Sequence, residues 1–123
     1  MGVQKMKWVY FLPALMCAGA IFMLSTFFGQ ALPNPVPDLI ASDKLGHAIA
    51  YFCLATSIAW GYSQHKKLNN RLIWTIIMLS ALYGFCLEIL QLLLFTGRYF
   101  DWWDMLANFV GALCAKLIIH FFK

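Results

Sequence analysis

Residues 72–95, LIWTIIMLSALYGFCLEILQLLLF, form an apolar run whose only charged member is Glu88. An α-helix needs about 20 apolar residues to cross the roughly 30 Å hydrocarbon core of a bilayer. The run is long enough, and it therefore predicts a transmembrane helix. A charged residue within such a helix costs about 2.5–3.5 kcal/mol, so Glu88 needs polar partners inside a helix bundle, or a proton.

The whole chain has the composition of a membrane protein. Of its 123 residues, 63% are hydrophobic and 11% are charged, whereas soluble domains average about 45–50% apolar and about 25% charged residues. We expect one domain with four spans, at residues 8–28, 44–62, 72–95 and 102–122. The predicted fold is an all-α membrane protein, a bundle of four transmembrane helices.

Prolines shape the expectations for the first span and the segment after it. Residues 8–28 carry no charge, and their apolar run exceeds the 7–15 residues typical of a signal peptide. We therefore expect a retained helix with a kink near Pro13. Residues 31–42, ALPNPVPDLIAS, hold three prolines within five positions. Because proline lacks a backbone donor and disfavours helix in the residue before it, we predict an extended loop here.

Charge is distributed unevenly between the two ends of the predicted bundle. One end has only basic residues, while the other combines two basic residues with four aspartates. The positive-inside rule assigns the first end to the cytoplasm. Both termini are thus expected inside a multi-pass protein of the cytoplasmic membrane. The first end carries Lys5, Lys7, Lys66, Lys67, Arg71, Lys116 and Lys123, and the second carries Asp38, Asp43, Lys44, Arg98, Asp101 and Asp104.

Three further patterns have structural interpretations. The four cysteines show neither C-x-x-C spacing nor a zinc-ligand pattern, so we expect them to act as small hydrophobes. Basic residues are not interleaved with aromatics as in a nucleic-acid-binding surface, so we expect no nucleic-acid partner. Small residues recur at helical spacing and predict close helix packing: Gly46, Ala50, Cys53 and Ser57 in the second span, and Ala107, Gly111 and Ala115 in the fourth.

Polar residues gather on one face of three spans, at similar depth in the predicted outer half of the bilayer. They are spaced three or four positions apart, which places them on a common helix face. The inner half has no matching polar faces. We call this set the polar layer: Asp43, His47 and Tyr51 in the second span, Glu88 and Gln91 in the third, and Asp101, Asp104 and Asn108 in the fourth, with Lys44 and Arg98 beside them.

Each of these residues alone has an ordinary explanation. Asp101 and Asp104 suit a helix N-terminus, and a single His47 would be a satisfied buried histidine. Arg98 can reach the headgroups from a nearby position, and Trp102 and Trp103 fit the aromatic belt of a membrane protein. Because ionisable groups within membrane spans are rare and usually functional, their combination favours a site.

Three stretches carry a family resemblance: DKLGHAIAY from Asp43, YGFCLEILQ ending at Gln91, and GRYFDWWDMLANFVGA from Gly97. They resemble the VanZ-like family motifs D-K-x-x-H, E-x-x-Q and R-x-x-D-x-x-D-x-x-x-N-x-x-G, and every motif position is occupied. The resemblance covers essentially the whole chain. It implies a small integral membrane protein of the bacterial cell envelope, in a family named after a protein linked to teicoplanin resistance. Resistance by this chain itself is not implied.

The first functional hypothesis is a site that binds, and in one version processes, the phosphate-bearing headgroup of an envelope lipid. Lys44 and Arg98 would hold phosphate oxygens. His47, oriented by Asp43 or Glu88, would be the general acid–base or the nucleophile. The remaining expected roles are ligand contacts by Tyr51, Gln91 and Asn108, and a divalent cation held by Asp101 and Asp104.

Two other hypotheses stay open. In one, the polar layer is a structural staple, meaning that its contacts hold the helices together at the outer end of the bundle. The protein then acts without catalysis, by occupying lipid or through a membrane partner. Buried ionic networks are weak evidence for stability, so this reading needs the layer for packing specificity. In the other, protons or ions move through Glu88, His47 and Asp43. The missing polar residues of the inner half argue against a continuous path.

Overall fold

The computed structural model describes residues 7–24, 37–94 and 102–122, and the side chains of all these residues except 37–44 and 122. Every regular element in this part of the chain is helical, which confirms the predicted fold class at the level of an all-α protein. A short 3-10 helix, η1 (Trp8–Phe11), precedes α1 (Leu12–Met23), and the longer helices are α2 (Pro37–Ser63), α3 (Asn70–Leu94) and α4 (Trp102–Ile119). A final 3-10 turn, η3, covers His120–Phe122.

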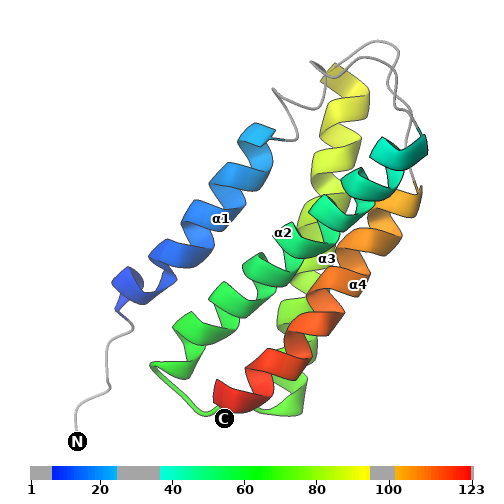
Figure 1. The fold of residues 1–123 in the computed structure, drawn as a ribbon. Helices are drawn as coiled ribbons and strands as arrows, with labels where there is room; N and C mark the ends of the chain where they lie inside the picture. Colours follow the sequence, from blue (N-terminus) through cyan, green and yellow to red (C-terminus); the bar gives the residue numbers. More distant parts are fainter. Residues whose placement is uncertain (1–6, 25–36, 95–101, 123) are drawn as a thin grey trace, which may run out of the picture.

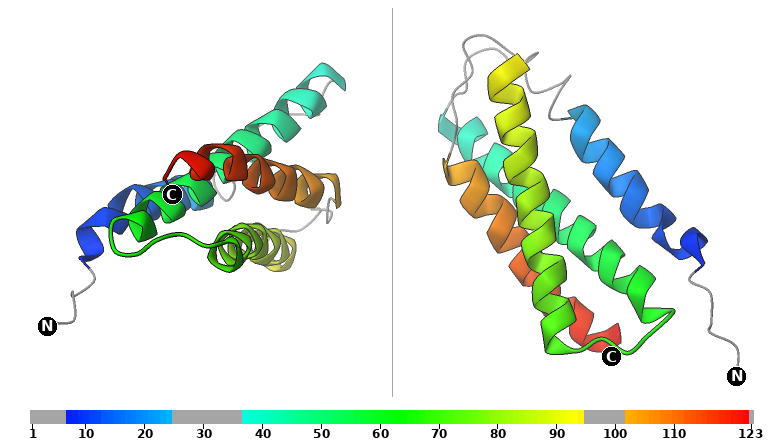
Figure 2. Two further views of the ribbon diagram at one scale, coloured as in Figure 1. Left: turned by 90° about the horizontal axis from the view of Figure 1, so that it is seen from below. Right: turned by 180° about the vertical axis from the view of Figure 1, so that it is seen from behind.

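Helix α2 is the centre of the arrangement. It lies between α1 and α4, while α3 packs against both α2 and α4 (Figures 1 and 2). Successive helices alternate in direction, so the turn between α2 and α3 lies at the same end as the start of α1 and the end of α4 (Figure 1). Consequently the polar residues near the end of α3 and the start of α4 share the opposite end of the bundle.

One expectation about proline is wrong, and a second concerns the start of α1. Helix α2 begins at Pro37, so residues 37–42 are helical rather than part of an extended loop. Proline is tolerated in the first helical position, because its N–H would have no partner there and its φ is already helical. Pro13 is the second residue of α1 and follows η1. The helical run of residues 8–23 thus changes from a 3-10 helix to an α-helix just before Pro13, close to where the kink was expected.

The turn between α2 and α3 contains its own stop and start signals. The backbone N–H groups of His65 and Lys66 both donate to the carbonyl of Tyr62, at 2.9 and 3.0 Å. Asn69 then caps α3, because its side-chain Oδ1 accepts the N–H of Leu72 at 2.8 Å. An asparagine at this position satisfies one of the unpaired donors of the first helical turn. The polar stretch predicted between the second and third spans is thus a capped turn.

The closest approach between helices is that of α2 and α4. A Cβ atom added to Gly111 would collide with the backbone of Ala48, so glycine is required where the two helices touch. The predicted role of Gly111 is confirmed. The small-residue stripe predicted for α2 is confirmed only in part. A Cβ at Gly46 would meet nothing within 4 Å and Cys53 is exposed, whereas Ala50 packs against a buried apolar cluster and Ser57 Oγ lies 3.7 Å from Cys17 Sγ of α1. A periodicity of small residues does not determine which face a neighbouring helix covers.

Apolar side chains fill the bundle at the end that carries the basic residues. Alanines of α2 and α4 pack here against isoleucines of α3 and α4, all nearly or fully buried. A second apolar cluster joins α1, α2 and α3 and includes Ile21, Leu54 and Leu87. The first cluster fills this half of the bundle with apolar side chains. It consists of Ala55, Ala59, Leu68, Ile73, Ile76, Ile77, Ala112, Ala115 and Ile119.

The outer surface of the bundle is also apolar. Within the described ranges, α3 and α4 are long and apolar enough to cross a membrane. Only 39% and 33%, respectively, of an apolar 18-residue stretch in each helix is buried. Exposed leucines such as Leu79, Leu93 and Leu117 cover much of the remainder. A soluble monomer rarely exposes apolar patches of this extent, so the surface indicates a membrane environment.

Candidate functional site

The polar layer is organised around His47. Its Nδ1 lies 3.1 Å from Oδ1 of Asn108, and its Nε2 lies 3.8 Å from a carboxylate oxygen of Asp104. Asp104 and Asn108 are one turn apart on the inner face of α4 and both are buried. These two contacts come from α4, which approaches α2 closely at Ala48 and Gly111. The expected orientation of His47 by Asp43 or Glu88 stays a prediction, because the side chain of Asp43 lies outside the described part of the structure.

A glycine on α3 makes room for this group. A Cβ added to Gly84 would lie 2.5 Å from Nδ2 of Asn108 and 2.9 Å from the hydroxyl oxygen of Tyr51. Tyr51 is buried on α2 one turn beyond His47, so three helices meet at this point. Gly84 was missing from the candidate site residues. The sequence could have indicated Gly84, because it lies one turn before Glu88 on the same helix face.

Glu88 and Gln91 complete the described part of the layer from α3. They are 6% and 2% exposed, although both lie within the last two turns of the helix. The side-chain oxygen Oε1 of Gln91 is buried and has no hydrogen-bond partner among the described residues. Such an atom is unusual, because buried polar side-chain atoms nearly always have a partner. It leaves an acceptor available to a donor group.

The remaining predicted residues lie at the edge of the described structure or beyond it. Asp43 and Lys44 belong to the first turns of α2, one turn before His47, and nothing is described of their side chains. Arg98 and Asp101 lie outside the described residues. The roles of Lys44 and Arg98 in phosphate binding, and of Asp101 with Asp104 in cation binding, therefore stay predictions.

The geometry at His47 limits the chemistry that it can perform. When Oδ1 of Asn108 accepts a hydrogen bond, Nδ1 of the imidazole is the donor. The second ring nitrogen, Nε2, faces the Asp104 carboxylate at 3.8 Å. Both nitrogens thus already face protein groups. This arrangement suits an imidazole that is held in position more than a free nucleophile.

Charges among the described residues of the layer are mainly acidic. Glu88 and Asp104 contribute carboxylates, while His47 is the basic group, with 23% of its side chain exposed. In the described ranges, no group of three histidine, cysteine, aspartate or glutamate side chains is arranged to hold a metal ion. The site as described therefore offers acceptors for hydroxyl or ammonium donors, and a partly accessible imidazole.

Comparison with known proteins places this arrangement in a family. An uncharacterized protein of the fission yeast Schizosaccharomyces pombe is 30% identical over 98 residues, which cover 80% of this chain and 57% of the relative. The chain thus spans little more than half the length of that protein. No solved structure is significantly similar. The VanZ/LLP1 family matches residues 6–123, a range that includes all three motifs and every residue of the polar layer. The chain belongs to the VanZ/LLP1 family.

Proposed function

We propose that the protein crosses the cytoplasmic membrane four times and binds the phosphate-bearing headgroup of an envelope lipid in its polar layer. Both termini face the cytoplasm in this proposal, and the layer lies in the outer half of the bilayer. Family membership and the exposed apolar faces of α3 and α4 support a membrane location. The excess of basic residues at one end supports the orientation.

Gln91 is the observation that carries the proposal. Its buried, unpartnered Oε1 belongs to the same helix face as Glu88 and Gly84. If the layer served only to staple helices, each buried polar atom would be expected to have a partner within the bundle, because an unsatisfied one costs about 1–3 kcal/mol. An acceptor left open by the described residues favours a ligand that supplies the donor.

The polar groups define the ligand that would fit. Gln91, Glu88 and Asp104 present oxygens, which recognise hydroxyl or ammonium donors. Lys44 and Arg98 supply the cations that phosphate oxygens require. A lipid headgroup that carries a phosphate together with hydroxyl or ammonium groups satisfies both sets. A lipid also reaches this depth laterally, without crossing water.

Binding is better supported than catalysis. Transfer of a group to His47 would require its Nδ1 to leave Asn108 or its Nε2 to turn away from Asp104. We therefore assign His47, with Asn108 and Asp104, to holding the headgroup. Processing of the lipid by His47, Glu88 and Asp43 stays a prediction. Tolerance to the glycopeptide teicoplanin is the phenotype suggested by the family's name.

Native mass spectrometry tests the proposal. The protein is extracted in a mild detergent, and bound lipids are identified by mass in the parent chain, in Gln91→Leu and in His47→Ala. Ser80→Ala is the matched control, because Ser80 is also buried in α3 but its hydroxyl donates within its own helix, to the carbonyl of Ile76 at 2.9 Å. We expect a phosphate-bearing lipid on the parent and on Ser80→Ala, and at least a tenfold lower occupancy on the other two variants.

Thermal unfolding of the same variants distinguishes a ligand-binding role of the polar layer from a purely structural one. Removing an unsatisfied polar atom should leave Gln91→Leu as stable as the parent in lipid-free detergent, or more stable by about 1 kcal/mol. A parent that carries no lipid after mild extraction would count against the headgroup site. Loss of stability in both Gln91→Leu and His47→Ala, with lipid occupancy unchanged in both, would leave the non-catalytic staple as the better account.

A further inference from the structure

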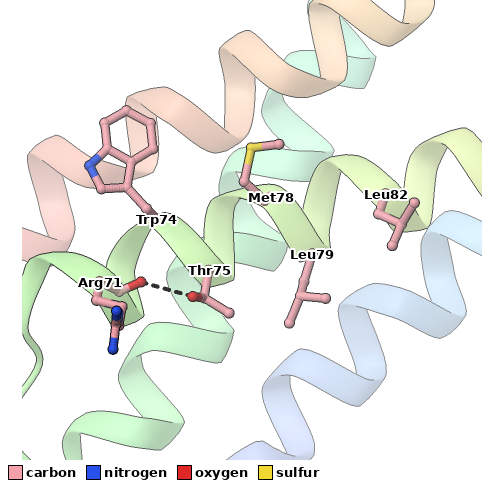
Figure 3. Close-up of a pocket in the computed structure, with 6 residues that line it drawn as sticks. All are labelled: Arg71, Trp74, Thr75, Met78, Leu79 and Leu82. Carbon is pink, nitrogen blue, oxygen red and sulfur yellow. Dashed lines mark hydrogen bonds between the residues drawn. The ribbon is translucent and has the colours of Figure 1, made fainter.

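A groove runs along the outer face of α3, at the end of the helix opposite to Glu88 and Gln91. It is lined by Arg71, Trp74, Thr75, Met78, Leu79 and Leu82. Figure 3 shows these side chains along the helix, with Arg71 and Trp74 at one end and Leu82 at the other. We call this surface the α3 groove, and we infer that it binds one anionic phospholipid of the cytoplasmic leaflet.

The charged end of the α3 groove matches a phosphate. Arg71 is exposed in the first turn of α3, and the ammonium of Lys116, from α4, lies 4.8 Å from the centre of the Trp74 ring. Among the described residues neither cation forms an ion pair with a carboxylate, since the described carboxylates, Glu88 and Asp104, belong to the polar layer at the other end. Two cations beside an interfacial tryptophan attract an anionic headgroup.

The rest of the groove matches an acyl chain. Met78, Leu79 and Leu82 are each more than half exposed, and the Thr75 hydroxyl is satisfied within the helix, where it donates to the carbonyl of Arg71 at 2.8 Å (Figure 3). Thr75 therefore leaves no unpaired polar group facing hydrocarbon. From Arg71 to Leu82 the helix rises about 16 Å, close to half of a roughly 30 Å hydrocarbon core. The groove thus has the length of one leaflet.

Position and charge together identify the leaflet. The α3 groove begins beside the turn between α2 and α3, where Lys66 and Lys67 add further positive charge. This is the end that the positive-inside rule assigns to the cytoplasm, and anionic lipids are attracted to basic groups at that surface. Since the groove and the polar layer occupy opposite ends of α3, failure of one ligand site leaves the other untouched.

Lipid competition tests the inference. The full chain is placed in nanodiscs made from equal parts of phosphatidylcholine and phosphatidylglycerol, and the lipids that remain bound on release are counted by native mass spectrometry. We expect the parent to retain phosphatidylglycerol in preference to phosphatidylcholine. Each cation near a lipid surface contributes about fivefold in affinity, so Arg71→Gln should lower that preference about fivefold, and Arg71→Gln with Lys116→Gln more strongly.

Lys67→Gln is the matched control, because it removes a basic residue of the neighbouring turn that does not line the groove. Lys67→Gln should lower the preference less than Arg71→Gln does, because Lys67 acts only through the general surface charge, and Arg71→Gln at an exposed position should fold like the parent. Equal retention of the two lipids by the parent would overturn the inference. An undiminished preference in the double variant would do so as well. The same loss in Lys67→Gln as in Arg71→Gln would assign the effect to diffuse charge rather than to this groove.

Discussion

His47 on α2 and Asn108 on α4 are joined through Nδ1 and Oδ1 at 3.1 Å, across 61 positions of the sequence. Their contact depends on the neighbouring residues of both helices: Ala48 directly follows the histidine, and Gly111 lies one turn beyond the asparagine. These two bring the helix backbones together. The hydrogen bond and the helix contact are therefore parts of one interface, and each can be perturbed separately.

Replacing Asn108 with alanine removes the acceptor of His47 Nδ1. Hydrogen bonds within membrane bundles contribute about 1 kcal/mol, and we expect a loss of that size in the free energy of unfolding. Asn108→Asp keeps an oxygen acceptor and should lose less than Asn108→Ala. Reversible unfolding in mixed micelles measures both, with Ser80→Ala as a buried control whose hydroxyl bonds only within α3. Equal stability of Asn108→Ala and the parent would contradict the role of this bond.

Gly111 and Gly46 form a matched pair of glycines on the two helices that meet. Gly111→Ala places a methyl group against the backbone of Ala48, and overpacking of this kind costs about 1–3 kcal/mol. Gly46→Ala adds the same methyl group where nothing lies within 4 Å. It should be neutral, or stabilising by up to about 1 kcal/mol, because alanine favours helix. Folded yield and unfolding temperature should therefore fall for Gly111→Ala, and they should rise or stay unchanged for Gly46→Ala.

Gly84→Ala tests the meeting point of three helices. The added methyl group would press on the Asn108 amide and the Tyr51 phenol, so we expect a loss of about 1–3 kcal/mol together with loss of bound lipid. Asn108→Ala clears part of that space. In a double-mutant cycle, the pair should therefore lose less than the sum of the single variants. Strict additivity would mean that Gly84 and Asn108 do not share this space in the folded protein.

Labelling of introduced cysteines tests the orientation in the membrane. In a background without the four native cysteines, single cysteines at Gln64, Ala31 and Gly97 are treated in intact cells with a maleimide that does not cross membranes. The positive-inside rule predicts labelling at Ala31 and Gly97 and none at Gln64 until the cells are permeabilised. Permeabilised cells provide the control for reactivity at each site. Labelling of Gln64 in intact cells would reverse the proposed topology.

Much of the site could be predicted because helical spacing fixes which residues share a face. The pairs His47 with Tyr51, Glu88 with Gln91, and Asp104 with Asn108 each follow from three- or four-residue spacing. Except for the partly exposed His47, these residues are buried, as polar groups in an apolar bundle must be if lipid surrounds it. Local geometry was sufficient for this part of the prediction.

The unpredicted features depend on how helices rotate and slide against one another. Gly46 and Ala48 are both small residues of α2, and only packing against Gly111 selects Ala48. The contact of His47 with Asn108 accompanies that packing, and helical spacing alone did not predict it. The helical start at Pro37 was missed for a different reason: proline is unfavourable inside a helix and favourable at its first position.

The contact between Gly111 and Ala48 also bears on access to the polar layer. At this level the backbones of α2 and α4 touch, and parting them would break the fit on which His47 and Asn108 depend. The two helices therefore leave no space between them at Ala48 and Gly111. If the layer binds a headgroup as proposed, the approach would be on the side covered by α3, where Gly84 lies against the Asn108 amide and the Tyr51 hydroxyl. The two closest approaches around the polar layer, at Gly111 and at Gly84, thus both occur at residues that carry no side chain.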